Sequence, residues 1–300
     1  MDIKDVVVIG AGPAGIATAI QLKRSNIEPV LLEQGEIGGL LRNANLVENY
    51  PGFPEGISGP DLVELFEKHL ENTGVRVNFE RALELEYRER AFFIKTNRRM
   101  IRSTIVVIAT GTRPRTIPAL SILDDMKERI FYEIDPIGGI KNKRIAIIGA
   151  GDAAFDYALN LSQKNEVIIL NRRKQAECIP VLEERSMKSE NISCLHNVNV
   201  DINSEDNKIL LTCIDCDSQN ATKICTDYVV IAIGREPCLD FLGEEIKKCF
   251  ENLIKTNLLY MVGDIRNEIY RQTAICVGDG IKAAMKIYKL ASEAQRQGDR

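Results

Sequence analysis

The sequence predicts an α/β protein with two three-layer, Rossmann-like dinucleotide-binding domains, the second inserted in the first. The first observation is a strand-sized apolar run that ends in glycines at the G-x-G-x-x-G spacing, at residues 10–15. The second is a repeat of this pattern at residues 149–154. The third is a pair of closing segments, at residues 106–114 and 228–237, each with an apolar strand, a glycine and a proline. Four linked features in the same order indicate that a whole domain is duplicated.

The first glycine-rich turn joins an apolar strand at residues 6–9 to a helix. Gly10 permits the tight bend, Gly12 lets the backbone approach a pyrophosphate, and Gly15 lets helix and strand pack closely. The phosphates then lie on the unpaired N–H groups at the positive end of the helix dipole. The predicted contacts of this turn are Gly10, Gly12, Pro13, Ala14 and Gly15.

A second apolar strand, at residues 29–32, ends at Glu33, 23 residues after Gly10. In a parallel β-α-β unit this position is the tip of the second strand. A carboxylate there accepts hydrogen bonds from both ribose hydroxyls and repels a 2′-phosphate. The first domain is therefore expected to hold FAD or NAD, with Glu33 and the adjacent Gln34 as contacts. The alternative is a surface glutamate that follows an ordinary strand.

The rest of the first copy contains a structured loop, a helix and several strands. Two prolines and one glycine at residues 48–54 predict the loop. An amphipathic helix is expected to begin at Gly59. Three short alternating stretches within residues 75–96 suggest a small β-meander, and a buried strand follows at residues 104–109.

The second copy repeats the strand, helix and strand but differs in charge. Counting 23 residues from Gly149 reaches Arg172, where the first copy has Glu33. Arg172 and Arg173 offer guanidinium forks suited to a 2′-phosphate, which predicts an NADP(H) site with NAD(H) as the weaker candidate. The alternative is that residues 171–174 are a solvated run of charges.

Composition excludes several classes of partner. The chain has 300 residues, 45% of them apolar, enough for a core in each of two domains. Its net charge of −4 shows no electrostatic footprint for nucleic acid or an anionic membrane. The apolar runs are too short to span a bilayer. Eight cysteines without a visible signal peptide indicate reduced thiols. We therefore expect a cytoplasmic protein that binds neither nucleic acid nor membrane.

Cys213 and Cys216 form a C-x-x-C pair. A redox dithiol gains its low pKa from a helix N-terminus or a cationic neighbour. This pair lies instead in an apolar, alternating strand beside Asp215 and Asp217, which favours a structural role over a redox one. A metal site would need further ligands, and the chain has only two histidines, so no metal is predicted.

The two copies in this order resemble the pyridine nucleotide-disulfide oxidoreductase superfamily, and the details are similar to its thioredoxin reductase branch. The resemblance spreads over almost the whole chain. It implies an FAD-binding domain at residues 1–112 and 251–300, an NAD(P)H-binding domain at residues 113–250, and a homodimer. For FAD it adds the contacts Gly39, Leu40, Leu41, Asn49, Ala109, Thr110, Gly111, Gly263, Asp264, Arg271, Gln272 and Thr273. For the nicotinamide nucleotide it gives Gly149, Gly151, Asp152, Ala153, Ala154, Arg172, Arg173, Gly234 and Arg235.

The chain departs from the family at the redox pair. Thioredoxin reductases carry a C-x-x-C whose cysteines would be residues 132 and 135, and here these are Tyr132 and Asp135. The absent dithiol argues against standard thioredoxin reduction. The segment at residues 131–158 is similar instead to thioredoxin-reductase-like ferredoxin/flavodoxin-NADP reductases, which also lack the dithiol. Tyr132 and Asp135 are candidates for proton transfer, although Asp135-Pro136 favours a turn. Two smaller departures are Leu40, where the family often has a flavin-contacting Gln, and Glu177, which replaces a cofactor-binding Arg.

The resemblance implies an FAD-dependent oxidoreductase. It would take hydride from NADPH to flavin and pass electrons, without an internal dithiol, to an acceptor that the sequence does not identify, either a redox protein or a small molecule. One alternative is an atypical thioredoxin or disulfide reductase that uses Cys213 and Cys216, or that reduces a substrate disulfide directly at the flavin. Another is a non-catalytic flavin or nucleotide redox sensor.

Overall fold

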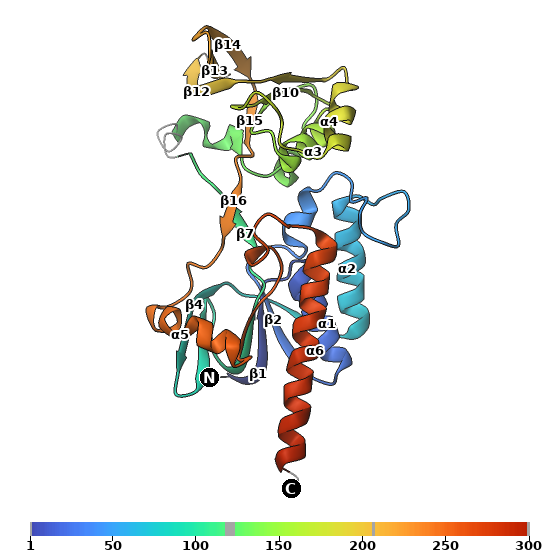
Figure 1. The fold of residues 1–300 in the computed structure, drawn as a ribbon, viewed down its shortest axis with the longest axis vertical. Coiled ribbons are helices and arrows are strands. Elements are labelled where there is room, and N and C mark those ends of the chain that lie inside the picture. Colours follow the sequence, from blue (N-terminus) through green and yellow to red (C-terminus); the bar gives the residue numbers. More distant parts are fainter. Residues whose placement is uncertain (1, 118–123, 206–207, 299–300) are drawn as a thin grey trace. The chain divides into compact units, whose positions relative to one another are not determined.

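The computed structural model describes residues 2–117, 124–205 and 208–298. The chain divides into two compact units (Figure 1). Unit 1 comprises Met1–Arg42, Val47–Arg113 and Glu236–Arg300, and unit 2 comprises Asn43–Leu46 and Pro114–Arg235. The chain leaves unit 1 at β7 (Thr112–Pro114) and returns at β16 (Arg235–Pro237), and these two strands pair with each other.

Unit 1 is built on a seven-stranded sheet in the order β3-β2-β1-β6-β5-β4, with β17 paired to the second half of β6. Helices α1, α2 and α6 pack on one face, with α6 lying along α1 (Figure 1), and α5 packs against β4 and β17. The strands are β1 (Asp2–Ile9), β2 (Pro29–Glu33), β3 (Val77–Phe79), β4 (Ala82–Arg88), β5 (Ala91–Thr96), β6 (Met100–Ile108) and β17 (Leu259–Met261). The helices are α1 (Pro13–Arg24), α2 (Gly59–Thr73), α5 (Glu244–Lys255) and α6 (Thr273–Gly298), with 3-10 turns η1 (Gly39–Asn43) and η5 (Gly263–Ile265).

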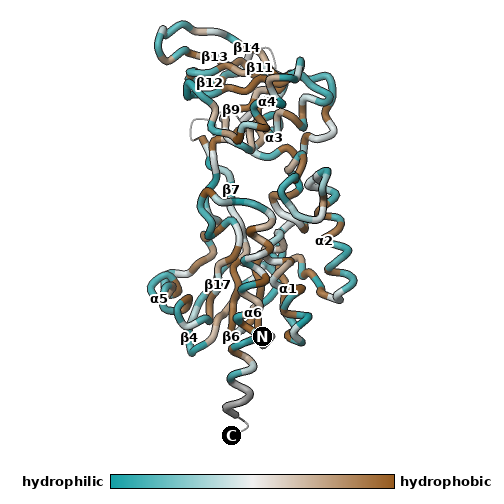
Figure 2. Tube along the Cα trace, turned by 45° about the vertical axis from the view of Figure 1, so that its right-hand side comes forward, coloured by the Kyte–Doolittle hydropathy of each residue, from teal (hydrophilic) through white to brown (hydrophobic). Residues whose placement is uncertain are grey.

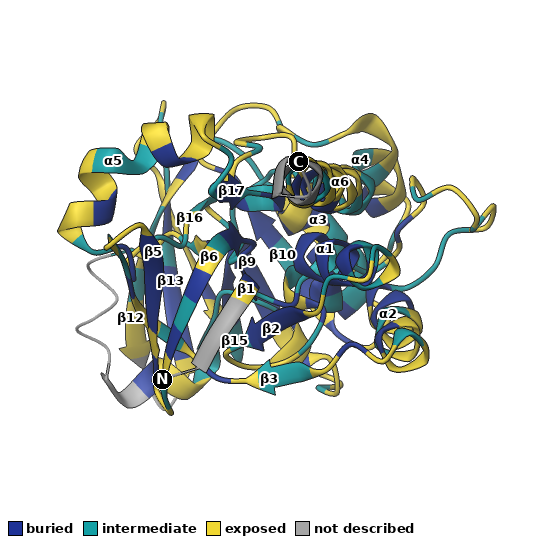
Figure 3. Cartoon of the chain, turned by 90° about the horizontal axis from the view of Figure 1, so that it is seen from below, coloured by how far each residue is buried: buried dark blue, intermediate teal, exposed yellow. Residues whose placement is uncertain are grey.

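The side chains of β1 show how the two faces of this sheet are filled. Val6 and Val8 lie in the apolar cluster under α1 and α6, whereas Val7 and Ile9 lie in the cluster on the opposite face. This alternation follows from the two-residue period of a strand. Because both faces of this part of β1 are covered, residues 6–9 form a continuous apolar run, as is typical of a central parallel strand. Figure 3 shows that most of α1 is buried as well.

Unit 2 has a five-stranded parallel sheet in the order β11-β10-β9-β15-β8. Two apolar clusters fill the core of unit 2. In one, the parallel sheet packs against α3 (Asp152–Leu161) and α4 (Pro180–Met187), and in the other it packs against a three-stranded antiparallel sheet. The parallel strands are β8 (Ile130–Phe131), β9 (Arg144–Ile148), β10 (Glu166–Leu170), β11 (Ile192–Leu195) and β15 (Tyr228–Ile231). The antiparallel strands are β12 (Val198–Glu205), β13 (Lys208–Asp215) and β14 (Ala221–Thr226), and the 3-10 turns are η3 (Asp124–Arg129) and η4 (Asp135–Ile137). Figure 2 shows apolar residues concentrated along the strands of each unit.

Four parallel strands have the same order in the two units, which confirms the predicted fold class, whereas the fifth follows the other four in the chain in unit 1 and precedes them in unit 2. In unit 1 the parallel part runs β3-β2-β1-β6-β17, and in unit 2 it runs β11-β10-β9-β15-β8. In unit 1 the fifth strand, β17, comes from the chain after unit 2, as expected when the second copy is inserted in the first. Within the described residues, no helix is both long and apolar enough to cross a membrane.

The structure corrects the predicted meander and the predicted domain borders. Residues 77–79 form β3, which pairs in parallel with β2, because α2 is the crossover that brings the chain back beside that strand. Residues 236–250 lie in unit 1 instead of the second domain, since Phe241 and Ile246 are buried in its core. The segment Asn43–Leu46 is grouped with unit 2 because its polar atoms bond there.

Candidate dinucleotide-binding sites

The first glycine turn is shaped by two close backbone approaches. Gly10 has a φ of +105°, and a Cβ at this position would lie 2.4 Å from the carbonyl oxygen of Ala109. A Cβ on Gly15 would lie 1.9 Å from the carbonyl oxygen of Gly10. Both contacts are with backbone, so neither position accommodates a larger residue without moving α1 or its neighbouring strands. A Cβ on Gly12 would meet no atom within 4 Å, which leaves this side of the turn open.

The start of α1 offers unpaired backbone donors. Gly12 is the N-cap and makes no side-chain capping bond, Pro13 is the first helical residue, and the first turn contains no acidic residue. The first helical turn therefore contains no acid of its own, and its N-cap provides no side-chain acceptor for its N–H groups. This arrangement fits the pyrophosphate of a dinucleotide, which such a helix terminus binds.

The Glu33 carboxylate is fixed beside this turn. Its Oε2 accepts the Ala11 N–H at 2.7 Å and its Oε1 accepts the Gly35 N–H at 2.9 Å. Each carboxylate oxygen keeps a lone pair for a further donor. The predicted proximity of strand tip and glycine turn is thus present, and the geometry fits two ribose hydroxyls.

Several predicted residues from distant segments meet this same turn. A Cβ on Gly39 would lie 3.6 Å from the Cα of Gly12, and a Cβ on Gly263 would lie 2.8 Å from the Cβ of Ala14. Gly263 precedes Asp264 in η5, so the returning C-terminal segment reaches the start of α1. The turn, η1 and η5 form one cradle, and this cradle fits FAD.

The Asp264 side chain is held by a buried thiol. The Cys276 Sγ donates to the Asp264 Oδ1 at 3.1 Å. Burial raises the pKa of the Cys276 thiol, and the Asp264 carboxylate raises it further, so the sulfur stays protonated and donates. Asp279 stabilises the same segment, because its Oδ2 accepts from the Gly263 N–H at 3.2 Å and the Asn267 Nδ2 at 2.6 Å.

Other predicted FAD contacts are placed as follows. The Asn49 Nδ2 donates a hydrogen bond of 2.9 Å to the Oε1 of Gln272, 223 residues away in the sequence. The Thr110 hydroxyl donates to the Cys238 carbonyl at 2.8 Å, Leu41 is buried, and Gln34 is exposed. The sequence did not point to Asp279 or Cys276. A Gly-Asp-Gly at residues 278–280 inside a helix was the available signal for Asp279.

The second glycine turn repeats the backbone geometry of the first. Gly149 has a φ of +127°, and a Cβ there would lie 2.2 Å from the carbonyl oxygen of Ala232. Gly151 is the N-cap of α3 and makes no side-chain capping bond. The difference is an acid in the first helical turn, Asp152, whose Oδ1 accepts the Ile179 N–H at 2.8 Å. This turn also fits a pyrophosphate.

The basic run after β10 is an ordered turn around Asn171. The buried Asn171 donates from Nδ2 to the Gln175 carbonyl at 2.9 Å and accepts the Arg173 N–H at 2.9 Å. Its Nδ2 lies 3.1 Å from the His196 Nδ1. Arg172 is exposed, with no hydrogen bond or ion pair to any residue that the structure describes, whereas Arg173 is ion-paired with Glu177. Only one of the two predicted guanidinium forks is therefore uncommitted.

The segment at the expected redox pair is a capped turn without thiols. The buried Asn43 accepts the N–H groups of Ile134 and Asp135, each at 2.9 Å. Asp135 begins the 3-10 turn η4, as the Asp-Pro pair suggests, and is exposed. Glu133 pairs with Arg235 at 3.0 Å. No pattern in the sequence indicates the capping role of Asn43.

The C-x-x-C pair has the surroundings of structural cysteines. Cys213 lies in β13 and is buried in the apolar cluster between the two sheets of unit 2, whereas Cys216 follows the strand in a turn. Burial raises the pKa of the Cys213 thiol, which works against thiolate formation. Both thiols are free. Within the described ranges, no group of three or more potential metal ligands is present.

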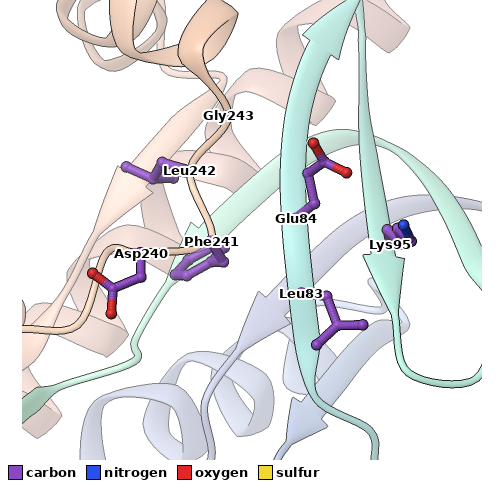
Figure 4. A pocket seen from close by; sticks show the side chains of 7 residues that line it. All are labelled: Leu83, Glu84, Lys95, Asp240, Phe241, Leu242 and Gly243. Atoms are coloured by element: carbon purple, nitrogen blue, oxygen red, sulfur yellow. The ribbon is translucent and has the colours of Figure 1, made fainter.

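One small open pocket, with a volume of about 170 Å³, lies elsewhere in unit 1 (Figure 4). It is lined by β4, β5 and the segment before α5, where the Leu85 N–H donates to the Phe241 carbonyl at 2.7 Å. None of the predicted site residues lines it. This pocket lies where the segment before α5 covers the edge strand β4.

Comparison with known proteins identifies the family. The sequence profile of the pyridine nucleotide-disulphide oxidoreductases matches residues 4–298. The chain belongs to this family. It is 29% identical to the thioredoxin reductase of Bacillus subtilis (strain 168), over 98% of this chain and 96% of that protein. The crystal structure of Lactococcus lactis thioredoxin reductase superposes with a TM-score of 0.86 at 28% identity, covering 97% of this chain and 99% of that one.

A more distant structure shares the fold alone. Bacillithiol disulfide reductase Bdr from Bacillus cereus superposes with a TM-score of 0.74 at 19% identity, covering 96% of this chain and 99% of that one.

Family membership confirms the predicted enzyme class and cofactors. The protein is an FAD-containing, NAD(P)H-dependent oxidoreductase similar to thioredoxin reductases.

Proposed function

We propose that unit 1 binds FAD, that unit 2 binds NADPH, and that electrons pass from the flavin to an external acceptor without a dithiol of this chain. The observation that carries the proposal is the convergence of Gly39, Ala14 and Gly263 at the first glycine turn, together with a capped, thiol-free turn at residues 132–135. The first feature supports a flavin site assembled from three segments. The second supports electron transfer without a dithiol relay at this turn.

The residues of unit 1 would bind and orient the cofactor. The first-turn N–H groups of α1 would bind the pyrophosphate, and the Glu33 carboxylate would accept from the ribose hydroxyls. Asp264, held by Cys276, and the Asn49–Gln272 pair would contact the flavin side. When bound, FAD accepts a hydride from the nicotinamide nucleotide and delivers electrons to the acceptor.

In unit 2 the exposed Arg172 would contact the 2′-phosphate and the N–H groups at the start of α3 would bind the pyrophosphate. Arg172→Ala should then raise the dissociation constant of NADPH about tenfold, as expected for a lost charge-assisted bond, with little change for NADH. Equal losses for both nucleotides would contradict this role.

The acceptor that we propose is a small redox protein or a small molecule that meets the flavin directly. A disulfide substrate is the second candidate, because the similar proteins are thioredoxin reductases. The burial of Cys213 argues against Cys213 and Cys216 as its relay. Family membership favours an enzyme over a non-catalytic sensor.

The assembly that we propose is a cytoplasmic homodimer. On α6 the side chains of Ile281, Met285 and Tyr288 are exposed at helical spacing, which supports burial against a second copy. The eight free cysteines support a reducing compartment. Light scattering of wild type and Met285→Glu tests the dimer, which the added charge should weaken.

Spectroscopy tests the enzyme. The purified protein should show an oxidised-flavin spectrum that NADPH bleaches without oxygen. Reoxidation is then followed with ferredoxin, flavodoxin, thioredoxin and a quinone, in wild type and in the Cys213→Ser/Cys216→Ser variant. We expect the variant to retain the wild-type rates. A flavin that neither NADPH nor NADH bleaches would refute the proposal. Loss of disulfide reduction in the variant would show instead that Cys213 and Cys216 relay electrons from the flavin to the disulfide.

A further inference from the structure

Glu177 places a carboxylate beside the second glycine turn. Its N–H donates to the Ala150 carbonyl at 2.9 Å, and its backbone forms a parallel bridge with Gly151. Two residues later, the Ile179 N–H donates to Asp152 at 2.8 Å. Because the segment contributes only backbone atoms to these contacts, residue 177 stays beside the start of α3 whatever its side chain. An acid therefore adjoins a helix terminus that otherwise favours anions.

The Glu177 carboxylate is ion-paired with Arg173. The backbone of Arg173 is fixed at both ends, since its N–H donates to the Asn171 Oδ1 at 2.9 Å and its carbonyl accepts the Asn197 N–H at 3.0 Å. The two paired side chains are each about 60% exposed, so the guanidinium can reorient while its backbone remains in place. Arg173 can thus bond either Glu177 or an incoming phosphate.

The neighbouring basic residues do not replace Arg173. Lys174 is ion-paired with Asp217 at 2.8 Å, and Arg172 offers only one guanidinium group. NADPH and NADH differ only in the 2′-phosphate, and a planar guanidinium is the side chain best suited to bind it. The state of Arg173 therefore affects one nucleotide and not the other.

We propose that Glu177 is a specificity-determining residue that lowers the preference for NADPH over NADH by competing with the 2′-phosphate for Arg173. This inference rests on the proposed nucleotide site of unit 2. When NADPH binds, Arg173 exchanges the carboxylate for the phosphate, and Glu177 is left close to a second anion. NADH binding needs no such exchange. The wild-type enzyme is accordingly less selective than its two arginines alone would make it.

The test is equilibrium binding of oxidised nucleotides to the FAD-loaded enzyme by titration calorimetry. Glu177→Gln removes the charge and retains the shape and the backbone bond to Ala150. We expect the ratio of the NAD⁺ to the NADP⁺ dissociation constant to rise about fivefold, which is the scale of an exposed ion pair and a nearby like charge. The gain should shrink at high salt, because ions screen both effects.

Two further variants isolate the cause. Glu184→Gln in α4 removes the same charge from an exposed position and should leave the ratio unchanged. In an Arg173→Ala background, Glu177→Gln should change the ratio less, because only the repulsion between the carboxylate and the phosphate remains to be removed. An equal change for both nucleotides, a matching effect of Glu184→Gln, or an undiminished gain in the Arg173→Ala background would overturn the inference. Wild type that binds neither NADP⁺ nor NAD⁺ would instead refute the nucleotide site of unit 2, and this inference with it.

Discussion

Substitutions at the first glycine turn should separate folding from cofactor binding. Gly15→Ala would place a Cβ 1.9 Å from the Gly10 carbonyl oxygen, whereas ordinary contact begins at 3.4 Å. The two groups must therefore move apart by 3.4 − 1.9 = 1.5 Å, against an α1 that is packed on α6. Overpacking of this kind costs about 3 kcal/mol. For a domain of this size that lowers the melting temperature of the apoprotein by about 6–12 °C.

Gly12→Ala should have the opposite pattern. The φ and ψ of Gly12 are −76° and 179°, which alanine adopts freely, and its Cβ meets no protein atom within 4 Å. The melting temperature of the apoprotein should therefore stay at or slightly above the wild-type value, because alanine restricts the unfolded chain. The added methyl group occupies the space where the pyrophosphate would approach. FAD affinity should fall at least about tenfold, or about 1.4 kcal/mol.

The assay is a thermal scan of apoprotein and a fluorescence titration with FAD for each variant. Gly139→Ala in unit 2 is the matched control, because its Cβ would also meet no atom within 4 Å and the position needs no positive φ. It should change neither quantity. Wild-type FAD affinity in Gly12→Ala would refute the placement of the pyrophosphate. An unchanged melting temperature in Gly15→Ala would refute the close packing of the turn.

Three further predictions follow from single contacts. Glu33→Gln should weaken FAD binding about tenfold by titration, since two ribose hydroxyls lose a charged acceptor; unchanged affinity would contradict the ribose role. Arg99→Ala should lower the free energy of unfolding of unit 1 by about 3 kcal/mol in a urea titration, because it leaves the buried Glu80 carboxylate without its partner at 3.0 Å, and a change below about 1 kcal/mol would argue against that pair. Burial raises the pKa of Tyr157 from 10.0 to about 12. The neutral, buried phenol therefore makes its full contribution to the free energy of unfolding below pH 10, and this contribution is lost as the pH rises toward 12. At pH 11 this loss is about 1.4 kcal/mol, and Tyr157→Phe should remove it from the pH dependence of unfolding.

The glycine turns and their strands could be predicted because their signals are local. An apolar run, a glycine at positive φ and a following helix are read from neighbouring residues, and residues 10–15 and 149–154 have that geometry. The position of Glu33 was predictable for the same reason, because a β-α-β unit fixes the spacing between turn and strand tip. The Glu33 carboxylate does lie on the Ala11 N–H.

Contacts made by side chains across long sequence separations could not be predicted. Asn43 caps a turn 91 residues away, and its sequence neighbours give no sign of this. The sequence places Phe241 and Ile246 in the second domain, whereas both are buried in unit 1, because an amphipathic helix has the same pattern whichever sheet it covers. Residues 77–79 are similarly ambiguous, since a short strand carries no mark of parallel or antiparallel pairing.

The two glycine turns share a backbone and differ in how an acid reaches them. At the first, the acid is at the strand tip, and its carboxylate accepts the backbone N–H of Ala11 while keeping lone pairs toward the cradle. At the second, Glu177 arrives from the following loop, bonds the turn through its own N–H, and directs its carboxylate to Arg173. Counting from the glycines finds Glu33 and Arg172 but passes over Glu177, because that residue reaches the turn by backbone pairing and not by strand spacing. The charge that a nucleotide meets at the second turn therefore depends on one ion pair, which is why substitution at Glu177 should separate NADPH from NADH binding more clearly than any change to the glycines.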